Sequence, residues 1–317
     1  MKYGIGQSVT RKEDPKFLMG RGCYVGDVEI PNEAFGYVLR SPHANARINS
    51  INTRTAKKLS GVLAILTGED YIAAGLGNIT CATMFPGLMD GREGVQHPFG
   101  ALVTGSAKCV GAPVVFIIAE SLNLAKDAAE LIEIDYEPLP AVSSTVQAIT
   151  GETPLVWEGT DSNVAFTFKI GNSSKVEHIL KNSAHVIRAA ITNNRVTTNS
   201  MEPRASIGIY DQGTEKYTLF ASNQAPNRAR QDIASGILKI SETKHRVISP
   251  DVGGGFGMKG VFYSEDVLVL WGAKVTGRPV KWIGERLESF MSDSQGRDVL
   301  ADCEMSFDEA GKITSLR

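Results

Sequence analysis

The sequence carries one strongly glycine-rich segment, GGGFGMKG at residues 253–260. It follows HRVISP, whose β-branched residues predict a strand, and it precedes residues 262–275, whose apolar pattern predicts a helix. Glycine adopts positive φ without steric cost and lets the main chain approach a ligand closely. The N-terminus of a helix offers free N–H groups and a positive dipole end. The segment therefore predicts a fold that mixes strands and helices around a tight backbone turn.

Three interpretations of this segment compete. The spacing Gly255-x-Gly257-x-x-Gly260 satisfies the fingerprint of an NAD- or FAD-binding unit, in which an acidic residue follows about 20 residues later. Here Glu285 stands 28 residues after Gly257, which is too far. A phosphate-binding P-loop needs a Ser or Thr after its Gly-Lys pair, and Lys259-Gly260 lacks it. The third interpretation is a turn that only packs tightly, and the segment alone leaves these alternatives open.

Composition excludes several classes of protein. The 317 residues include 33 Lys and Arg against 35 Asp and Glu, so the net charge of −2 argues against a general nucleic-acid binder. No apolar run approaches the roughly 20 residues that a membrane span needs, and no secretory signal is visible. The cysteines lack the CxxC spacing of zinc, iron–sulfur or disulfide frameworks, and they stand at Cys23, Cys81, Cys109 and Cys303. We expect a soluble, cytoplasmic protein.

Alternating short segments predict an α+β fold. Runs rich in β-branched residues predict strands at 35–40, 62–66, 114–119, 184–197 and 216–222, and apolar residues at helical spacing predict helices at 121–132 and 226–238. The region after Pro138 carries several Pro, Ser and Thr and little periodicity, which is typical of a linker. We expect an N-terminal domain at 1–140, a linker at 141–162, and a second, partial domain at 163–317.

Several strings, in collinear order, resemble the large subunits of the xanthine dehydrogenase, aldehyde oxidase and aerobic carbon monoxide dehydrogenase family. They are RKEDPKFLMGRGCYVGDV (11–28), RSPHANARI (40–48), GAPVVFIIAESLNLAKDAAELIEIDYEPLPAV (111–142), MEPRA (201–205), ASNQAPNRARQ (221–231), VGGGFGMK (252–259) and GRPVKWIGERLESF (277–290). The resemblance implies an α/β-hammerhead domain followed by the first part of a molybdopterin-binding domain. It also implies a molybdenum hydroxylase that oxidises aldehydes, N-heterocycles or carbon monoxide with oxygen derived from water.

The same resemblance assigns roles to individual residues. Gln224 matches a glutamine whose amide donates to a molybdenum-bound oxygen, a task that suits an uncharged donor. Arg297 matches an arginine of the substrate pocket, although an ion pair with Asp298 or Glu285 is an equal alternative. The residues that lie against the cofactor are expected to be Gly254, Gly255, Phe256 and Gly257. No side chain of this chain is expected to ligate the metal directly.

Departures from the family pattern limit what the resemblance implies. Gly260 stands where purine hydroxylases often have a glutamate, so purine specificity is not expected. The family's catalytic glutamate, its general base, has no counterpart in these residues. Glu202 of MEPRA is expected to be a structural carboxylate at the domain interface.

The resemblance also implies cofactors and partners. The chain is expected to bind molybdopterin, in the plain or the cytosine dinucleotide form, and to be inert alone. Its partners would be a polypeptide completing the molybdenum subunit, an iron–sulfur small subunit and an FAD medium subunit. A chain missing its second half would expose apolar surface and self-associate. The alternatives are a non-catalytic scaffold of the same fold and the NAD- or FAD-binding oxidoreductase considered above.

Overall fold

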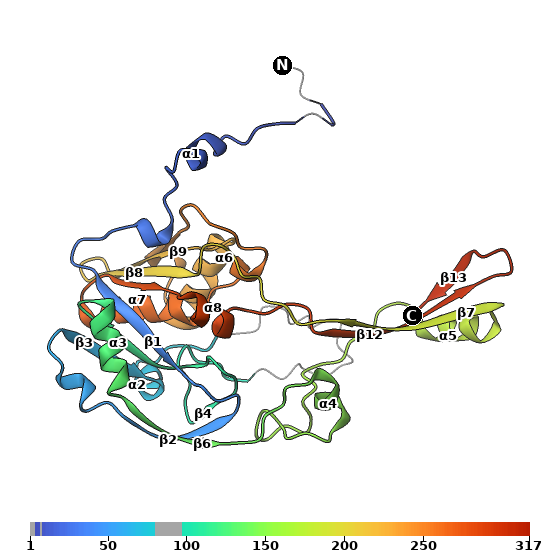
Figure 1. The fold of residues 1–317 in the computed structure, drawn as a ribbon, viewed down its shortest axis with the longest axis horizontal. Coiled ribbons are helices and arrows are strands. Elements are labelled where there is room, and N and C mark those ends of the chain that lie inside the picture. The colour runs from blue at the N-terminus through green and yellow to red at the C-terminus, as the bar shows by residue number, and fades with distance from the viewer. Residues whose placement is uncertain (1–3, 7, 80–96) are drawn as a thin grey trace.

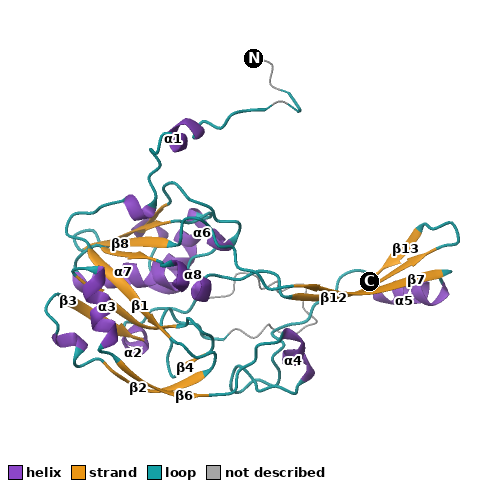
Figure 2. Cartoon of the chain, in the orientation of Figure 1, coloured by secondary structure: helices purple, strands orange, loops and turns teal. Residues whose placement is uncertain are grey.

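The computed structural model describes residues 4–6, 8–79 and 97–317. Helices and strands alternate along the chain (Figures 1 and 2). The helices are α1 (Asp14–Leu18), α2 (Gly68–Ala73), α3 (Leu122–Glu130), α4 (Thr145–Thr150), α5 (Ser173–Asn182), α6 (Pro226–Gln231), α7 (Ser264–Thr276) and α8 (Arg286–Ser292). The strands are β1 (Ala34–Arg40), β2 (Ala46–Asn52), β3 (Val62–Thr67), β4 (Ser106–Ala107), β5 (Pro113–Ala119), β6 (Glu133–Pro138), β7 (His185–Asn193), β8 (Ala205–Asp211), β9 (Lys216–Ala221), β10 (His245–Ile248), β11 (Val280–Ile283), β12 (Val299–Phe307) and β13 (Ile313–Leu316).

Within the described residues, a seven-stranded mixed sheet has the order β10-β9-β8-β11-β1-β5-β3. Its strands come from both sides of the predicted linker. The junction is the parallel pair β1–β11, in which Ala34 lies opposite Val280. Hydrogen bonding across this pair joins the two parts of the chain in one sheet.

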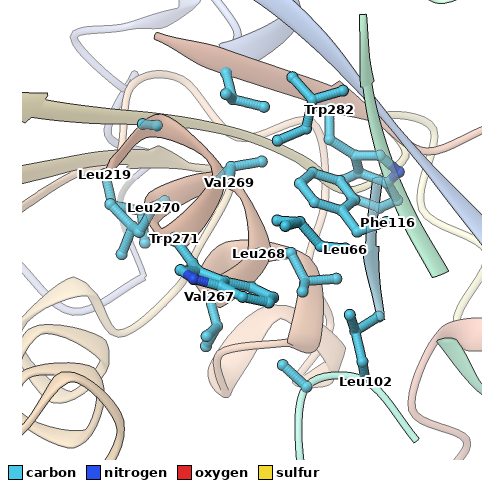
Figure 3. Close-up of a cluster of buried hydrophobic side chains, with 14 of the residues drawn as sticks. Leu66, Leu102, Phe116, Leu219, Val267, Leu268, Val269, Leu270, Trp271 and Trp282 are labelled. Atoms are coloured by element: carbon cyan, nitrogen blue, oxygen red, sulfur yellow. The ribbon is translucent and has the colours of Figure 1, made fainter. Parts of the chain in front are cut away.

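One face of the sheet is covered by α7, whose residues 265–273 are all buried. A helix that is apolar on every side belongs in a core, and Trp271 and Leu268 pack there with Phe116 and Trp282 (Figure 3). The helix approaches β8 so closely that a Cβ added at Gly208 would lie 2.3 Å from the carbonyl carbon of Val269. Glycine at this position therefore permits the contact between α7 and the sheet.

The N-terminal part packs a second core around α3. This helix begins after Ser121, whose hydroxyl accepts a 3.2 Å hydrogen bond from the N–H of Leu124. Its alanine-rich face contacts β1 and β5, and every residue of β5 is buried. A small sheet of order β4-β2-β6 lies beside it.

The sheet β13-β12-β7 forms an arm with α5 that projects from the body of the molecule (Figure 1). Strands β7 and β12 are paired antiparallel over their whole length, with Ile187 opposite Met305 and Ile191 opposite Ala301. Ile187 and Ile191 are both more than half exposed. The arm therefore presents apolar side chains to solvent.

Most predicted elements are present, and the structure adds several that were not predicted, among them α2, α5 and α8. The helix predicted at 226–238 is α-helical only to Gln231, and the turn at Asp232–Leu238 has π-helical hydrogen bonding. The expected linker 141–162 contains α4. Strands β2 and β8 were not predicted, since ARINSIN is largely polar and ASIGIYD is interrupted by glycine.

Candidate functional site

The glycine-rich segment connects β10 to α7 as an open turn. Gly254 and Gly257 have φ values of 100° and 93°, and Phe256 has the unusual φ of 49° for a residue with a side chain. Such strain costs about 1–3 kcal/mol and often marks a functional site. The Phe256 side chain is 80% exposed. The segment thus holds an aromatic side chain in solvent on a strained backbone.

Gln224 contacts this segment directly. Its Oε1 accepts a 3.0 Å hydrogen bond from the N–H of Gly257, and its own N–H donates to the carbonyl of Lys259 over 2.8 Å. A Cβ added at Gly255 would lie 2.5 Å from Cδ of Gln224. Among the described residues, Nε2 of Gln224 has no acceptor, so the amide keeps a free donor.

Three successive backbone donors of the segment are also free. The N–H groups of Gly254, Gly255 and Phe256 have no hydrogen-bond acceptor in the described part of the chain. Successive N–H groups on a backbone with alternating hand form a concave site for anionic or electron-rich atoms. This arrangement fits the head of a cofactor that carries oxo or sulfur ligands.

A buried ion pair lies beneath the segment and was not predicted from the sequence. The Lys259 side chain is fully buried, and its Nζ lies 2.9 Å from Oε2 of Glu202. The same Oε2 accepts a 2.7 Å hydrogen bond from the N–H of Gly253. Burial lowers the pKa of Lys259, and Glu202 opposes that shift. No local sequence pattern indicates this pair, because its members are 57 residues apart.

Arg297 does not contact the glycine segment. It is exposed with φ of 68°, and it has no ion pair among the described residues. Asp298 pairs instead with Arg195, and Glu285 with Lys126, so neither predicted ion-pair alternative is formed.

Tyr263 links the chain just before Arg297 to the segment. Its hydroxyl donates to the carbonyl of Met258 over 2.9 Å and accepts from the N–H of Ser294 over 3.1 Å.

A network of buried charges holds α7, the helix that follows the glycine segment, against β1 and α8. Arg204 donates to Glu265 over 2.5 Å and to Asp293 over 2.6 Å, and Arg40 donates to Glu265 over 2.5 Å and to Glu288 over 2.8 Å. Burial alone would raise the pKa of Glu265, but the two guanidinium groups lower it to about 2. The network connects β1 to α7 and α8, and it fixes α7, which begins just after the segment.

A cavity of about 420 Å³ borders the C-terminal end of the segment. Apolar residues such as Ala112, Val261 and Phe262 supply most of its lining surface. The lining also includes four charged residues, which are Arg40, Arg228, Asp232 and Glu265. A Cβ added at Gly260 would meet no atom within 4 Å. The absence of a side chain at Gly260 therefore leaves this end of the cavity open.

The described residues contain no group of three or more His, Cys, Asp or Glu side chains placed to hold a metal. Cys81 lies outside the described residues. No helix in the described part of the chain is long and apolar enough to cross a membrane.

The sheet topology does not support an NAD- or FAD-binding unit. In such a unit the strand before the glycine turn and the strand after the helix run parallel in one βαβ unit. Here β10 and β11 do run parallel in one sheet, but they are not neighbours, because β9 and the antiparallel strand β8 lie between them. The helix α7 begins only at Ser264, after a 3₁₀ turn at Met258–Gly260.

Comparison with known proteins gives two family matches. Residues 19–140 match the aldehyde oxidase and xanthine dehydrogenase a/b hammerhead domain, and residues 156–317 match the molybdopterin cofactor-binding domain. The predicted order of the two domains is thus confirmed.

Individual relatives agree with this assignment. The chain is 33% identical to the carbon monoxide dehydrogenase large chain of Afipia carboxidovorans, over 99% of this chain and 39% of that protein. It is 31% identical to the gamma subunit of the 6-hydroxypseudooxynicotine dehydrogenase complex of Paenarthrobacter nicotinovorans, over 99% and 38%. The structure of quinoline 2-oxidoreductase from Pseudomonas putida 86 superimposes with a TM-score of 0.89 at 32% identity, over 100% of this chain and 39% of that one.

The chain therefore spans less than half the length of these relatives. Both family models match in the expected order, and together they cover most of its residues. The chain belongs to the family of molybdopterin-binding large subunits of xanthine dehydrogenase, aldehyde oxidase and carbon monoxide dehydrogenase.

Proposed function

We propose that the chain forms the N-terminal part of the molybdenum-cofactor subunit of a molybdenum hydroxylase. The enzyme would oxidise carbon monoxide, an aldehyde or an N-heterocycle and take its oxygen from water. One observation carries the proposal. Gln224 is fixed against the glycine segment by two hydrogen bonds, while its Nε2 and three backbone N–H groups remain free.

The residues of the segment would hold the cofactor head without ligating the metal. When bound, molybdopterin supplies a metal centre that accepts electrons from the substrate. Nε2 of Gln224 would donate a hydrogen bond to an oxygen on that centre, and the N–H groups of Gly254, Gly255 and Phe256 would face its electron-rich atoms. The exposed ring of Phe256 would exclude water on one side, which strengthens these polar contacts.

The cavity beside Gly260 is the proposed chamber for the substrate. Its mostly apolar surface suits a neutral molecule, and position 260, as glycine, offers no side chain to bind a purine. Arg297 would enter the substrate pocket only in the assembled enzyme, where its charge would stabilise negative charge developing on the substrate. The general base would come from a part of the subunit outside these residues.

Three partners follow from this proposal. The rest of the molybdenum subunit would complete the site, since the chain spans 38–39% of its relatives. An iron–sulfur small subunit and an FAD medium subunit would carry the electrons onward in the cytoplasm. Within the chain, residues 1–140 would form the hammerhead domain, 141–162 the connection, and 163–317 the part that contacts the cofactor.

Metal analysis tests the proposal. The assembled complex would be purified from its native cells through a tag on this chain, and molybdenum and released pterin nucleotide would be measured. Near-stoichiometric molybdenum, with oxidation of one substrate class, is the expected result. Molybdenum at background would reject the proposal in favour of a non-catalytic scaffold, and saturable NAD binding would favour the dinucleotide alternative.

A further inference from the structure

We propose that the buried pair Lys259–Glu202 is a positioning pair that sets the conformation of the glycine segment and, through it, the orientation of Gln224. The effect of the pair on enzyme activity rests on the proposed function. The effect of the pair on the conformation of the glycine segment rests only on contacts within this chain.

Glu202 is tied to both ends of the segment. At the first end, its Oε2 accepts from the N–H of Gly253 over 2.7 Å, and its own N–H donates to the carbonyl of Gly253 over 3.1 Å. At the other end, Nζ of Lys259 donates to Oε2 and to the carbonyl of Glu202, both over 2.9 Å. One residue therefore holds together two positions that are six residues apart.

The fit at the first end is tight. A Cβ added at Gly253 would lie 2.5 Å from Cβ of Glu202, so only glycine allows this approach. The other oxygen of Glu202, Oε1, is buried without a hydrogen-bond partner in the described residues. Within that part of the chain, all hydrogen bonds of the carboxylate therefore go to the glycine segment.

Lys259 also connects the pair to Gln224. Its side chain binds Glu202, while its carbonyl accepts the 2.8 Å hydrogen bond from the N–H of Gln224. Gln224 in turn accepts from Gly257 through Oε1. The position of Lys259 thus determines the angle at which Gln224 meets the segment, and hence where its free Nε2 points.

Stability alone is a poor reason to bury these charges. Taking a lysine and a carboxylate out of water is costly, and apolar residues of similar volume often replace a buried ion pair without loss of stability. What apolar residues cannot do is accept from Gly253 and donate to the carbonyl of Glu202. The pair is therefore better explained by the geometry that it imposes.

The first test uses the full 317-residue chain and residue-resolved hydrogen exchange. The variant Glu202→Leu/Lys259→Met removes both charges together, which avoids a lone buried charge. We expect the N–H of Gly257, whose acceptor on Gln224 is not mutated, to exchange at least fivefold faster. Amides of α7 should keep their protection. The control Glu33→Leu/Lys281→Met removes another buried Lys–Glu pair, 3.7 Å apart, that does not touch the segment, and it should leave Gly257 unchanged.

The second test uses the assembled complex from native cells. We expect the double variant to retain at least threefold less molybdenum, or to show a lower kcat with an unaltered KM and a shifted Mo(V) electron paramagnetic resonance spectrum. Wild-type exchange at Gly257, or wild-type molybdenum content, kcat and spectrum together, would overturn the positioning role. Wild-type complex without molybdenum would instead reject the proposed function, and the exchange data would still decide whether the pair sets the segment.

If the double variant does not fold, Lys259→Arg provides the second measurement. A guanidinium keeps the charge and the donors but changes their geometry. A folded Lys259→Arg chain with faster exchange at Gly257 supports positioning, and unchanged exchange contradicts it.

Discussion

Oε1 of Gln224 accepts a 3.0 Å hydrogen bond from the N–H of Gly257. This bond fixes the orientation of the side-chain amide, because the carbonyl oxygen faces the segment and the NH₂ group must face away from it. A glutamine held in this way presents a donor at a defined position. A mutation of Gln224 can therefore affect activity without affecting stability, since Gln224 is exposed and not part of the buried core.

Replacing Gln224 should impair the enzyme and spare the fold. We expect Gln224→Ala to lower turnover of the assembled enzyme at least tenfold, because one oriented donor at the reacting centre is worth several kcal/mol. The unfolding midpoint should stay within a few degrees. The matched control is Gln231→Ala, an exposed glutamine at the end of α6. Equal turnover of the two variants would remove Gln224 from the site.

Gly255→Ala should act through Gln224. The new methyl group would lie 2.5 Å from both Cδ and Oε1 of Gln224, and this flexible side chain can move aside. We expect turnover to fall at least tenfold with a stability loss below about 1 kcal/mol. Gly236→Ala, where an added Cβ meets no atom within 4 Å, is the control. A large fall in the unfolding midpoint of Gly255→Ala would show that the contact is structural instead.

Gly208→Ala, in contrast to Gly255→Ala, should lower the stability of the fold. An added methyl group would meet the backbone of α7 at Val269, which cannot move aside as a side chain can. We expect a loss of about 1–3 kcal/mol in unfolding free energy, measured by urea denaturation. At Gly26 the nearest atom to an added Cβ is 3.7 Å away, so Gly26→Ala should be nearly neutral. Equal midpoints for the two variants would contradict the close packing of α7 on β8.

The exposed face of the arm should drive self-association of the isolated chain. Alternation along a strand places Ile187 and Ile191 on one face of β7, and both are more than half exposed. We expect Ile187→Thr/Ile191→Thr to lower the concentration-dependent mass measured by analytical ultracentrifugation. Ile149→Thr changes an isoleucine of α4 that is 63% exposed and lies outside the arm, and it should have no effect. A wild-type chain that stays monomeric at high concentration would refute the prediction.

Predictions from the sequence succeeded where one segment contains its own signal. Strand β5 is a continuous apolar run, and Ser121 marks the start of α3 as its N-cap. The predictions failed where the structure of a segment depends on contacts with residues far away in the sequence. Gly208 interrupts the apolar pattern of β8, because a glycine is needed there for the close contact with α7. The sequence of β2, ARINSIN, is largely polar because most of this strand is not buried. The pair Lys259–Glu202 could not be found from a single sequence, since nothing local marks either residue as the partner of the other.

The buried carboxylate of Glu265 should make stability depend on acid pH in a defined direction. Arg204 and Arg40 lower its pKa to about 2, below the ordinary 4.5, so the unfolded chain takes up this proton first as the pH falls. The contribution of the Glu265 carboxylate to the free energy of unfolding is complete above pH 4.5 and declines toward pH 2. At pH 7, Glu265→Gln should cost about 3 kcal/mol, because it leaves two buried guanidinium groups with less negative charge.

The difference between wild type and Glu265→Gln should therefore shrink at low pH. We expect it to fall by about 1.4 kcal/mol per pH unit below pH 4.5, as measured by urea denaturation at pH 7, 5, 4 and 3.5. Asp266 titrates in the opposite sense, because burial raises its pKa to about 6, but it is present in both proteins and largely cancels in the difference. A difference that stays constant from pH 7 to 3.5 would mean that the charge of Glu265 does not hold α7 against β1.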